Sequence, residues 1–182
     1  MMQMRIRIVR LFVFAGLFLT STSWSDEKVP EGYRSIATEH GIPYTLLYAV
    51  ALTESATQIN HSNTYRPWPW TLNVAGQGYF YDSRIAAWQA LKNWMRQGRR
   101  SIDIGLMQVN WRYHKKKLGT AWQALDPYHN LRVGAAILQD CYQARQNWWA
   151  SVGCYHSPAN TKRAESYRQR VVTHWRRIKR AG

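Results

Sequence analysis

Apolar residues recur at helical spacing over most of the chain that follows the first 30 residues. A first helix is predicted over residues 31–40 and ends at Gly41. A second helix begins with Pro43, whose missing N–H costs nothing in a first helical turn. One side of this helix carries Leu46, Leu47, Val50, Ala51 and Glu54. The pattern therefore places the carboxyl group of Glu54 at the C-terminal end of an apolar stripe.

The rest of the chain is predicted to be helical around one small β element. Residues 70–81 form two short strands around a glycine turn, and Ser83 is the expected N-cap of a helix that runs to Gln97. Asn130 is the expected N-cap of a long helix over residues 131–145. Further helices are expected over residues 120–125, 148–155 and 164–179, with turns at 60–69, a mixed segment at 102–110 and an exposed loop at Lys115–Lys117. The predicted fold class is α+β, mainly α.

The N-terminus has the layout of a secretory signal peptide. Arginines precede the apolar run of residues 11–19, and Ser23 and Ser25 stand at the −3 and −1 places of a cleavage site. The run is shorter than the about 20 residues that span a bilayer, although an uncleaved anchor is the alternative. The expected organisation is therefore a signal peptide over residues 1–25 and a single domain over residues 26–182, with no membrane span after cleavage.

The chain is strongly basic, with 25 Lys and Arg against 10 Asp and Glu. This excess favours polyanionic partners, and export argues against nucleic acid as the usual one. Export also favours a disulfide between the two cysteines, Cys141 and Cys154, over a pair of buried thiols. Such a bond closes a short loop and stabilises the fold by about 3 kcal/mol. The cysteines and the scattered histidines do not match zinc spacing, so no metal site is expected.

Glu54 is the strongest candidate for chemistry. A carboxyl group beside an apolar surface and near a helix C-terminus has a raised pKa. It can therefore keep its proton near neutral pH and donate it to a departing oxygen, which cleavage of a glycosidic bond requires. An ordinary glutamate at a helix end is the alternative that the spacing alone leaves open.

Four short motifs, taken in their order along the chain, favour a catalytic Glu54 over an ordinary glutamate. Glu54-Ser55 ends a helix, the segment GLMQVN covers Gly105–Asn110, the triplet Cys154-Tyr155-His156 follows the long helix, and Tyr167 lies on the last helix. This arrangement resembles the lytic transglycosylases of the soluble (SLT) type, relatives of goose-type lysozyme. The resemblance covers residues 31–172 and implies a lysozyme-like helical domain.

The resemblance also implies roles for these positions. Glu54 matches the catalytic acid and Ser55 a residue that hydrogen-bonds near it. Tyr155 and Tyr167 match tyrosines that position or polarise the acid. The expected substrate-binding set is Ser55, Gly105, Leu106, Met107, Gln108, Asn110, Tyr155, His156 and Tyr167. His156 replaces the asparagine of the family's Ala-Tyr-Asn triplet, which puts its role in doubt, and residues 65–81 look like an inserted β-hairpin.

The implied activity is non-hydrolytic cleavage of peptidoglycan between N-acetylmuramic acid and N-acetylglucosamine. One carboxylate acts first as acid and then as base, the product is a 1,6-anhydro sugar, and neither a metal nor an organic cofactor is needed. The expected location is the periplasm. The expected partners are glycan strands and a secretion, conjugation or pilus machine that needs local gaps in the wall.

Two other functions remain open. A hydrolytic muramidase needs a second carboxylate to activate water, and Asp103 and Asp82 are the mid-chain candidates. A non-enzymatic binding module would use the basic last helix, although a solvated charged face is the favoured interpretation of that helix. Its basic residues are Lys162, Arg163, Arg168, Arg170, Arg176, Arg177, Lys179 and Arg180.

Overall fold

The computed structural model describes residues 29–58 and 65–181, so the predicted signal peptide lies outside the described residues. The helices in this part are α1 (Glu31–Glu39), α2 (Tyr44–Ser55), α3 (Arg84–Arg96), α4 (Trp111–Leu118), α5 (Ala121–Ala124), α6 (Pro127–Arg145), α7 (Trp148–His156) and α8 (Thr161–Ala181). The strands are β1 (Ala56–Gln58), β2 (Tyr65–Pro67), β3 (Thr71–Val74), β4 (Gln77–Phe80), β5 (Ile102–Ile104) and β6 (Val109–Asn110). The predicted class, mainly helical α+β, is confirmed. No helix among these residues is long and apolar enough to cross a bilayer.

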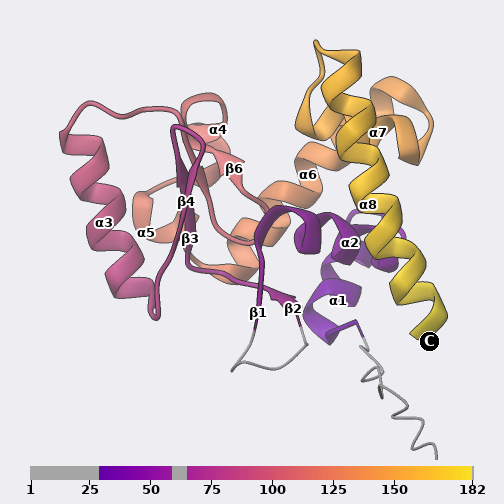
Figure 1. The fold of residues 1–182 in the computed structure, drawn as a ribbon, viewed down its shortest axis with the longest axis horizontal. Helices are drawn as coiled ribbons and strands as arrows, with labels where there is room; N and C mark the ends of the chain where they lie inside the picture. Colours follow the sequence, from indigo (N-terminus) through magenta and orange to yellow (C-terminus); the bar gives the residue numbers. More distant parts are fainter. Residues whose placement is uncertain (1–28, 59–64, 182) are drawn as a thin grey trace, which may run out of the picture.

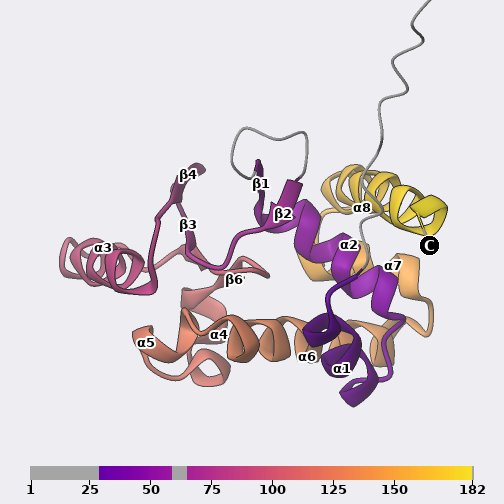
Figure 2. The ribbon, with the colours of Figure 1, turned by 90° about the horizontal axis from the view of Figure 1, so that it is seen from below.

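The elements form two groups that lie side by side (Figures 1 and 2). One group holds the strands β3–β6 with α3, α4 and α5, and the other holds α1, α2, α7 and α8. The long helix α6 runs from the first group to the second and packs against α1, α4, α5 and α7. The C-terminal end of α2 meets the turn after β5, where the hydroxyl of Ser55 donates to the carbonyl of Leu106.

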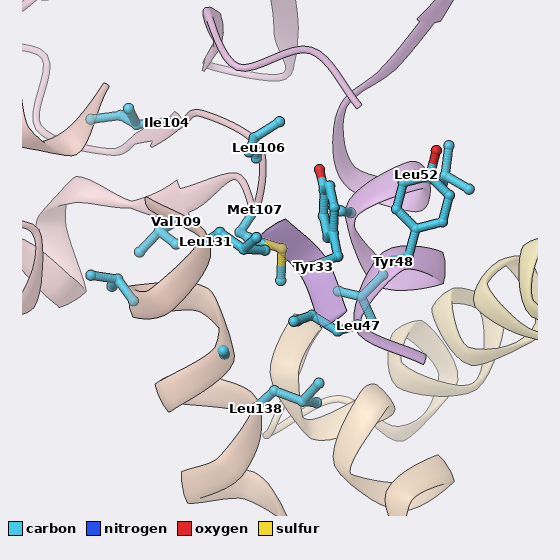
Figure 3. Close-up of a cluster of buried hydrophobic side chains, with 14 of the residues drawn as sticks. Tyr33, Leu47, Tyr48, Leu52, Ile104, Leu106, Met107, Val109, Leu131 and Leu138 are labelled. Carbon is cyan, nitrogen blue, oxygen red and sulfur yellow. The ribbon is translucent and has the colours of Figure 1, made fainter. Parts of the chain in front are cut away.

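Helix α2 is the central helix, and its burial exceeds the predicted single stripe. All seven residues from Leu46 to Leu52 are buried, because α1 and α8 both pack against this helix. Figure 3 shows Leu47 and Tyr48 of α2 beside Tyr33 of α1, and the two tyrosine rings meet edge to face at 4.8 Å. An almost wholly apolar helix thus carries a carboxyl group at its last turn.

The strands form two separate antiparallel sheets, which corrects the predicted hairpin over residues 65–81. Strand β2 pairs with β1, with Thr57 opposite Arg66, while β3 pairs with β4 and with β5. The order in the larger sheet is β4-β3-β5-β6. The hairpin is therefore limited to Thr71–Phe80. Strand β2, which precedes it, pairs instead with β1, the strand that directly follows α2.

Two local predictions were wrong. Asn130 does not cap α6, because the side chain of Asp126 accepts the N–H of His129 and Pro127 occupies the first turn. The lysines Lys115–Lys117 do not form a loop but the last turn of α4. Ser83 does cap α3 as predicted, and its hydroxyl accepts the N–H of Ala86.

The predicted disulfide joins Cys141 of α6 to Cys154 of α7. Helix α7 packs between α6 and α8, so the bond fixes one side of this three-helix contact. Tyr155 is the residue that follows Cys154, and the covalent link therefore also limits the movement of this tyrosine.

Candidate active site

Glu54 lies in the last turn of α2 and is half-buried. The hydroxyl of Tyr167, on α8, donates a hydrogen bond of 2.6 Å to its Oε1. None of the ion pairs among the described residues involves Glu54. The carboxyl group is therefore oriented by a neutral donor and forms no ion pair with a described residue.

Burial raises the pKa of Glu54 to about 7. The hydrogen bond from Tyr167 lowers this pKa, the negative charge of Asp103 raises it, and the positive charge of Arg170 lowers it. At neutral pH both the acid and the carboxylate are therefore substantially populated. A single group in this state can donate a proton in one step and accept one in the next.

The acid has two tyrosines near it, Tyr167, which is buried, and Tyr155, which is half-buried. Burial and the charge of Glu54 raise the pKa of Tyr155 and that of Tyr167 well above the usual value, so both remain protonated donors. The hydroxyl of Tyr155 donates a 2.6 Å hydrogen bond to the carbonyl of Met107. Tyr155 therefore ties α7 to the 105–108 turn, whereas Tyr167 contacts the acid itself.

His156 is stacked on the ring of Tyr167, with centroids 4.3 Å apart and parallel planes. Burial, Arg170 and Arg163 lower the pKa of His156, so the ring is neutral at pH 7. His156, which stands where the family has an asparagine, thus lies against the tyrosine that orients Glu54.

The predicted sugar-binding turn is built around Asn130. Its Oδ1 accepts the N–H of Met107 at 2.9 Å, and its Nδ2 donates to the carbonyls of Ile104 and Ala124. Gly105 has a φ of 78°, and a Cβ there would lie 2.6 Å from the Asn130 side chain. Glycine is therefore required at Gly105 by both the backbone conformation and the space.

The side chains of this turn point in different directions. Met107 is fully buried and extends into the apolar cluster beside Leu131 (Figure 3), so it serves packing. Gln108, with a φ of 44°, donates its side-chain amide back to the carbonyl of Gly105 at 3.0 Å. Its amide nitrogen thus holds the turn, and a contact with substrate remains a prediction for Gln108.

Ser55 connects this turn to the acid. Its hydroxyl donates to the carbonyl of Leu106 at 2.7 Å, and the side chain is buried. Because Ser55 follows Glu54 directly, this bond fixes the end of α2 against the turn. The sequence predicts that Ser55 forms a hydrogen bond near the acid. In the structure this hydrogen bond joins the Ser55 hydroxyl to a backbone carbonyl.

Asn110 lies on the other side of the turn. Its Oδ1 caps α4 by accepting the N–H of Arg112, and its Nδ2 donates to Asp103 Oδ1 at 2.7 Å. Burial raises the pKa of Asp103, and the charge of Asp103 in turn acts on Glu54. Asp82, the other carboxylate considered for hydrolysis, is exposed before α3.

No group of three or more His, Cys, Asp or Glu side chains that could hold a metal is found among residues 29–58 and 65–181. The site therefore consists of one half-buried acid, two protonated tyrosines and a turn held by an asparagine. Comparison with known families gives a match that covers most of the chain. The family described as "Transglycosylase SLT domain" matches residues 33–174. The chain belongs to this family.

The matched residues include every predicted site position, from Glu54 to Tyr167. Curated relatives are the proteins named "Type IV secretion system protein virB1" of Brucella abortus, Brucella melitensis and Brucella suis. Each is 36% identical over 83 residues, which cover 41% of this chain and 32% of the relative. No solved structure is significantly similar to this chain. Membership of the SLT family supports the lysozyme-like character of the fold.

Sequence reasoning missed two contributors to this SLT site. Asn130 was expected at a helix start, although the adjacent Asp126-Pro127 pair is the stronger start signal. Arg170 was assigned to a solvated basic face, and it lies close enough to act on the pKa of Glu54. No local pattern indicates the Arg170 effect, because it depends on how α8 packs against α2.

Proposed function

We propose that this chain is a peptidoglycan lytic transglycosylase that cleaves the β-1,4 bond between N-acetylmuramic acid and N-acetylglucosamine. The observation that carries the proposal is the half-buried Glu54, with a pKa of about 7 and no ion-pair partner among the described residues. Membership of the SLT family supports the same reaction. In this proposal Glu54 keeps its predicted role as the acid and Tyr167 its role in orienting it. Ser55 and Tyr155, together with Asn130, act on the 105–108 turn.

In the proposed reaction the protonated Glu54 donates its proton to the glycosidic oxygen, and the bond from C1 to that oxygen breaks. The N-acetyl group of the muramic acid supports the positive centre at C1. The carboxylate of Glu54 then accepts the proton of the C6 hydroxyl, whose oxygen bonds to C1 and forms the 1,6-anhydro sugar. The proton that Glu54 gives in the first step returns in the second, so one carboxyl group suffices.

The pH dependence should respond in opposite directions to two substitutions. The first step needs a protonated Glu54, so the alkaline limb of kcat/KM follows its pKa. Asp103→Asn removes a charge that raises this pKa and moves the limb to lower pH. Tyr167→Phe removes a hydrogen bond that lowers it and moves the limb to higher pH. Rate profiles on soluble glycan strands from pH 5 to 9 measure both, and shifts in the same direction would contradict the assignment.

Hydrolysis is the second candidate, and Asp103 is the observation that favours it. This carboxylate is half-buried, hydrogen-bonded to Asn110 and close enough to Glu54 to affect its pKa. Mass spectrometry of the released muropeptides separates the two reactions. We expect anhydro ends in both the wild type and Asp103→Asn, whereas reducing ends that disappear in Asp103→Asn would establish a hydrolase.

The proposed setting is the periplasm, where the enzyme opens local gaps in the wall for a secretion, conjugation or pilus apparatus. The name of the Brucella relatives supports a secretion machine, and the predicted signal peptide supports export. The basic helix α8 is not needed as a separate binding module. Its residues Tyr167 and Arg170 act on Glu54, and Arg168 pairs with Glu165.

A further inference from the structure

His156 lies beside the proposed acid but has no part in the proposed reaction. It is the last residue of α7, and its imidazole ring stacks on the ring of Tyr167 with parallel planes and centroids 4.3 Å apart. His156 is exposed, whereas Tyr167 is only 1% exposed. The imidazole therefore has one face on the buried phenol ring and leaves the rest of its surface to the solvent. The sequence places His156 among the substrate-binding residues, whereas the contact seen here is with another residue of the site.

The residues directly before His156 fix the position of its backbone. Cys154 forms the disulfide with Cys141 of α6. Tyr155 donates its hydroxyl hydrogen to the carbonyl of Met107 at 2.6 Å. Helix α7 also packs along α8, the helix that carries the stacked tyrosine. The stack of His156 is therefore built into the packing of α7 against α8 and does not depend on a loosely held surface side chain.

The stack acts on a ring whose hydroxyl orients the acid. The hydroxyl of Tyr167 donates the 2.6 Å hydrogen bond to Oε1 of Glu54. A pair of stacked rings favours one relative orientation and contributes more than the apolar area that it buries. Because the phenol oxygen moves with its ring, a contact that holds the ring also holds the donor on the carboxyl group. An asparagine, which the family has at this place, offers no ring for such a contact.

The charges around this pair leave His156 neutral when Glu54 titrates. Partial burial, followed by the positive charges of Arg170 and Arg163, lowers the pKa of His156 from its ordinary value of 6.5. The pKa of Glu54 is about 7. At that pH the imidazole is uncharged, so it acts on Tyr167 through the stack and not through a charge. Among the described residues, the titratable and charged groups that act on these three side chains are Glu54 of α2, Asp103 of β5, Tyr155 of α7, and Arg163 and Arg170 of α8.

We propose that His156 is a positioning residue, which holds Tyr167 on Glu54 through the stacked rings. The inference rests on the proposed function for its effect on catalysis, since Glu54 is the acid only in that proposal. The hydrogen bond from Tyr167 lowers the pKa of Glu54. Loss of the stack leaves Tyr167 less firmly oriented and weakens this bond. The pKa of Glu54 then rises, and the acid is less well aligned for proton transfer.

The test measures the pKa of Glu54 by NMR titration of its carbon-13-labelled carboxyl group, which needs no catalysis. His156→Asn removes the ring, whereas His156→Phe keeps a ring that stacks but does not ionise. Both remove the imidazole, so a shift found only in His156→Asn arises from loss of the stack. We expect His156→Asn to raise the pKa of Glu54 and His156→Phe to keep the wild-type value. The control is His114→Asn, a half-buried histidine of α4 whose pKa is also lowered by burial, and it should leave the pKa of Glu54 unchanged.

The kinetic counterpart is measured on soluble glycan strands. His156→Asn should lower kcat about three- to tenfold and leave KM within about twofold, which corresponds to the loss of one aromatic contact. His156→Phe and His114→Asn should keep the wild-type kcat. A loss confined to KM would show that His156 binds substrate directly, and it would overturn the positioning role.

A double-mutant cycle with Tyr167→Phe tests the route of the effect. Tyr167→Phe removes the hydroxyl but keeps a ring, so adding His156→Asn should raise the pKa of Glu54 no further. Additive shifts, an unchanged or lowered pKa in His156→Asn, or an equal shift in His156→Phe would overturn the inference. A rise confined to His156→Asn supports it even when no strand is cleaved, which separates it from the proposed function. Should His156→Asn fail to fold, as circular dichroism detects, His156→Gln provides the same test.

Discussion

Replacement of Glu54 by glutamine is expected to lower the rate of sacculus clearing by about 10³–10⁴-fold while the fold is retained. This loss is at the upper end of the range for removal of one catalytic acid, because the same group also serves as base in the proposed second step. Oε1 of a glutamine can still accept the hydrogen bond from Tyr167. A turbidity assay on purified sacculi measures the rate, and product analysis confirms that the residual activity is enzymatic.

The matched control is Glu31→Gln, an exposed carboxylate in the first turn of α1. It should clear sacculi at the wild-type rate. Clearing by a folded Glu54→Gln variant at more than about a tenth of the wild-type rate would exclude Glu54 as the acid on this scale of effects.

The same substitution should also change stability, with a sign fixed by the pKa. Glu54 binds its proton up to about pH 7 in the folded state but only to about pH 4.5 in the unfolded state. Stability of the wild type therefore falls as the pH rises between these values. Glutamine does not ionise, so Glu54→Gln should be more stable than the wild type at pH 8 and equally stable at pH 4. The full pKa difference corresponds to about 3 kcal/mol, and solvent around the half-buried side chain reduces the expected gain at pH 8 to about 1–2 kcal/mol. Urea denaturation at the two pH values measures the difference, and a variant that is less stable at pH 8 would contradict the buried-acid assignment.

Substitution of Asn130 by alanine is expected to destabilise the protein by about 3–5 kcal/mol and to abolish activity. Asn130 is 1% exposed and satisfies three backbone groups, the N–H of Met107 and the carbonyls of Ile104 and Ala124. Alanine leaves all three buried without these partners. At about 2–4 °C for each kcal/mol, the melting temperature should fall by about 6–20 °C, as calorimetry would show.

Asn93→Ala is the control for this substitution, because Asn93 is an exposed asparagine within helix α3. It should leave the melting temperature unchanged or slightly higher, since alanine is the better helix former. An Asn130→Ala variant that melts within about 2 °C of the wild type would show that Asn130 does not hold the turn.

Features that depend on neighbouring residues were predictable from the sequence. The apolar run from Leu46 to Leu52 and the proline before it indicate α2, and therefore place Glu54 at a helix end. Ser83 is a strong N-cap signal and indeed begins α3. The pairing of Cys141 with Cys154 followed from the presence of two cysteines in a chain predicted to be exported.

Features that depend on distant packing were not predictable. The charged run Lys115–Lys117 predicts an exposed loop. Nothing in the charges of this run indicates that Asn110 caps helix α4, which contains these lysines. Strand β1 pairs with β2 through a register that no local turn signal specifies. Arg99 and Arg100 before β5 and Arg112 and Lys115 of α4 line one cavity together, and this grouping becomes evident only when β5 and α4 are placed side by side.

The bond between Tyr167 and Glu54 also bears on how the protein is made. These residues are 113 positions apart, so the glutamate leaves the ribosome long before its tyrosine partner exists. A nascent chain that ends before α8 contains the acid without the group that orients it. Assembly of the proposed acid site therefore waits until α8 has been synthesised, long after α2 has left the ribosome.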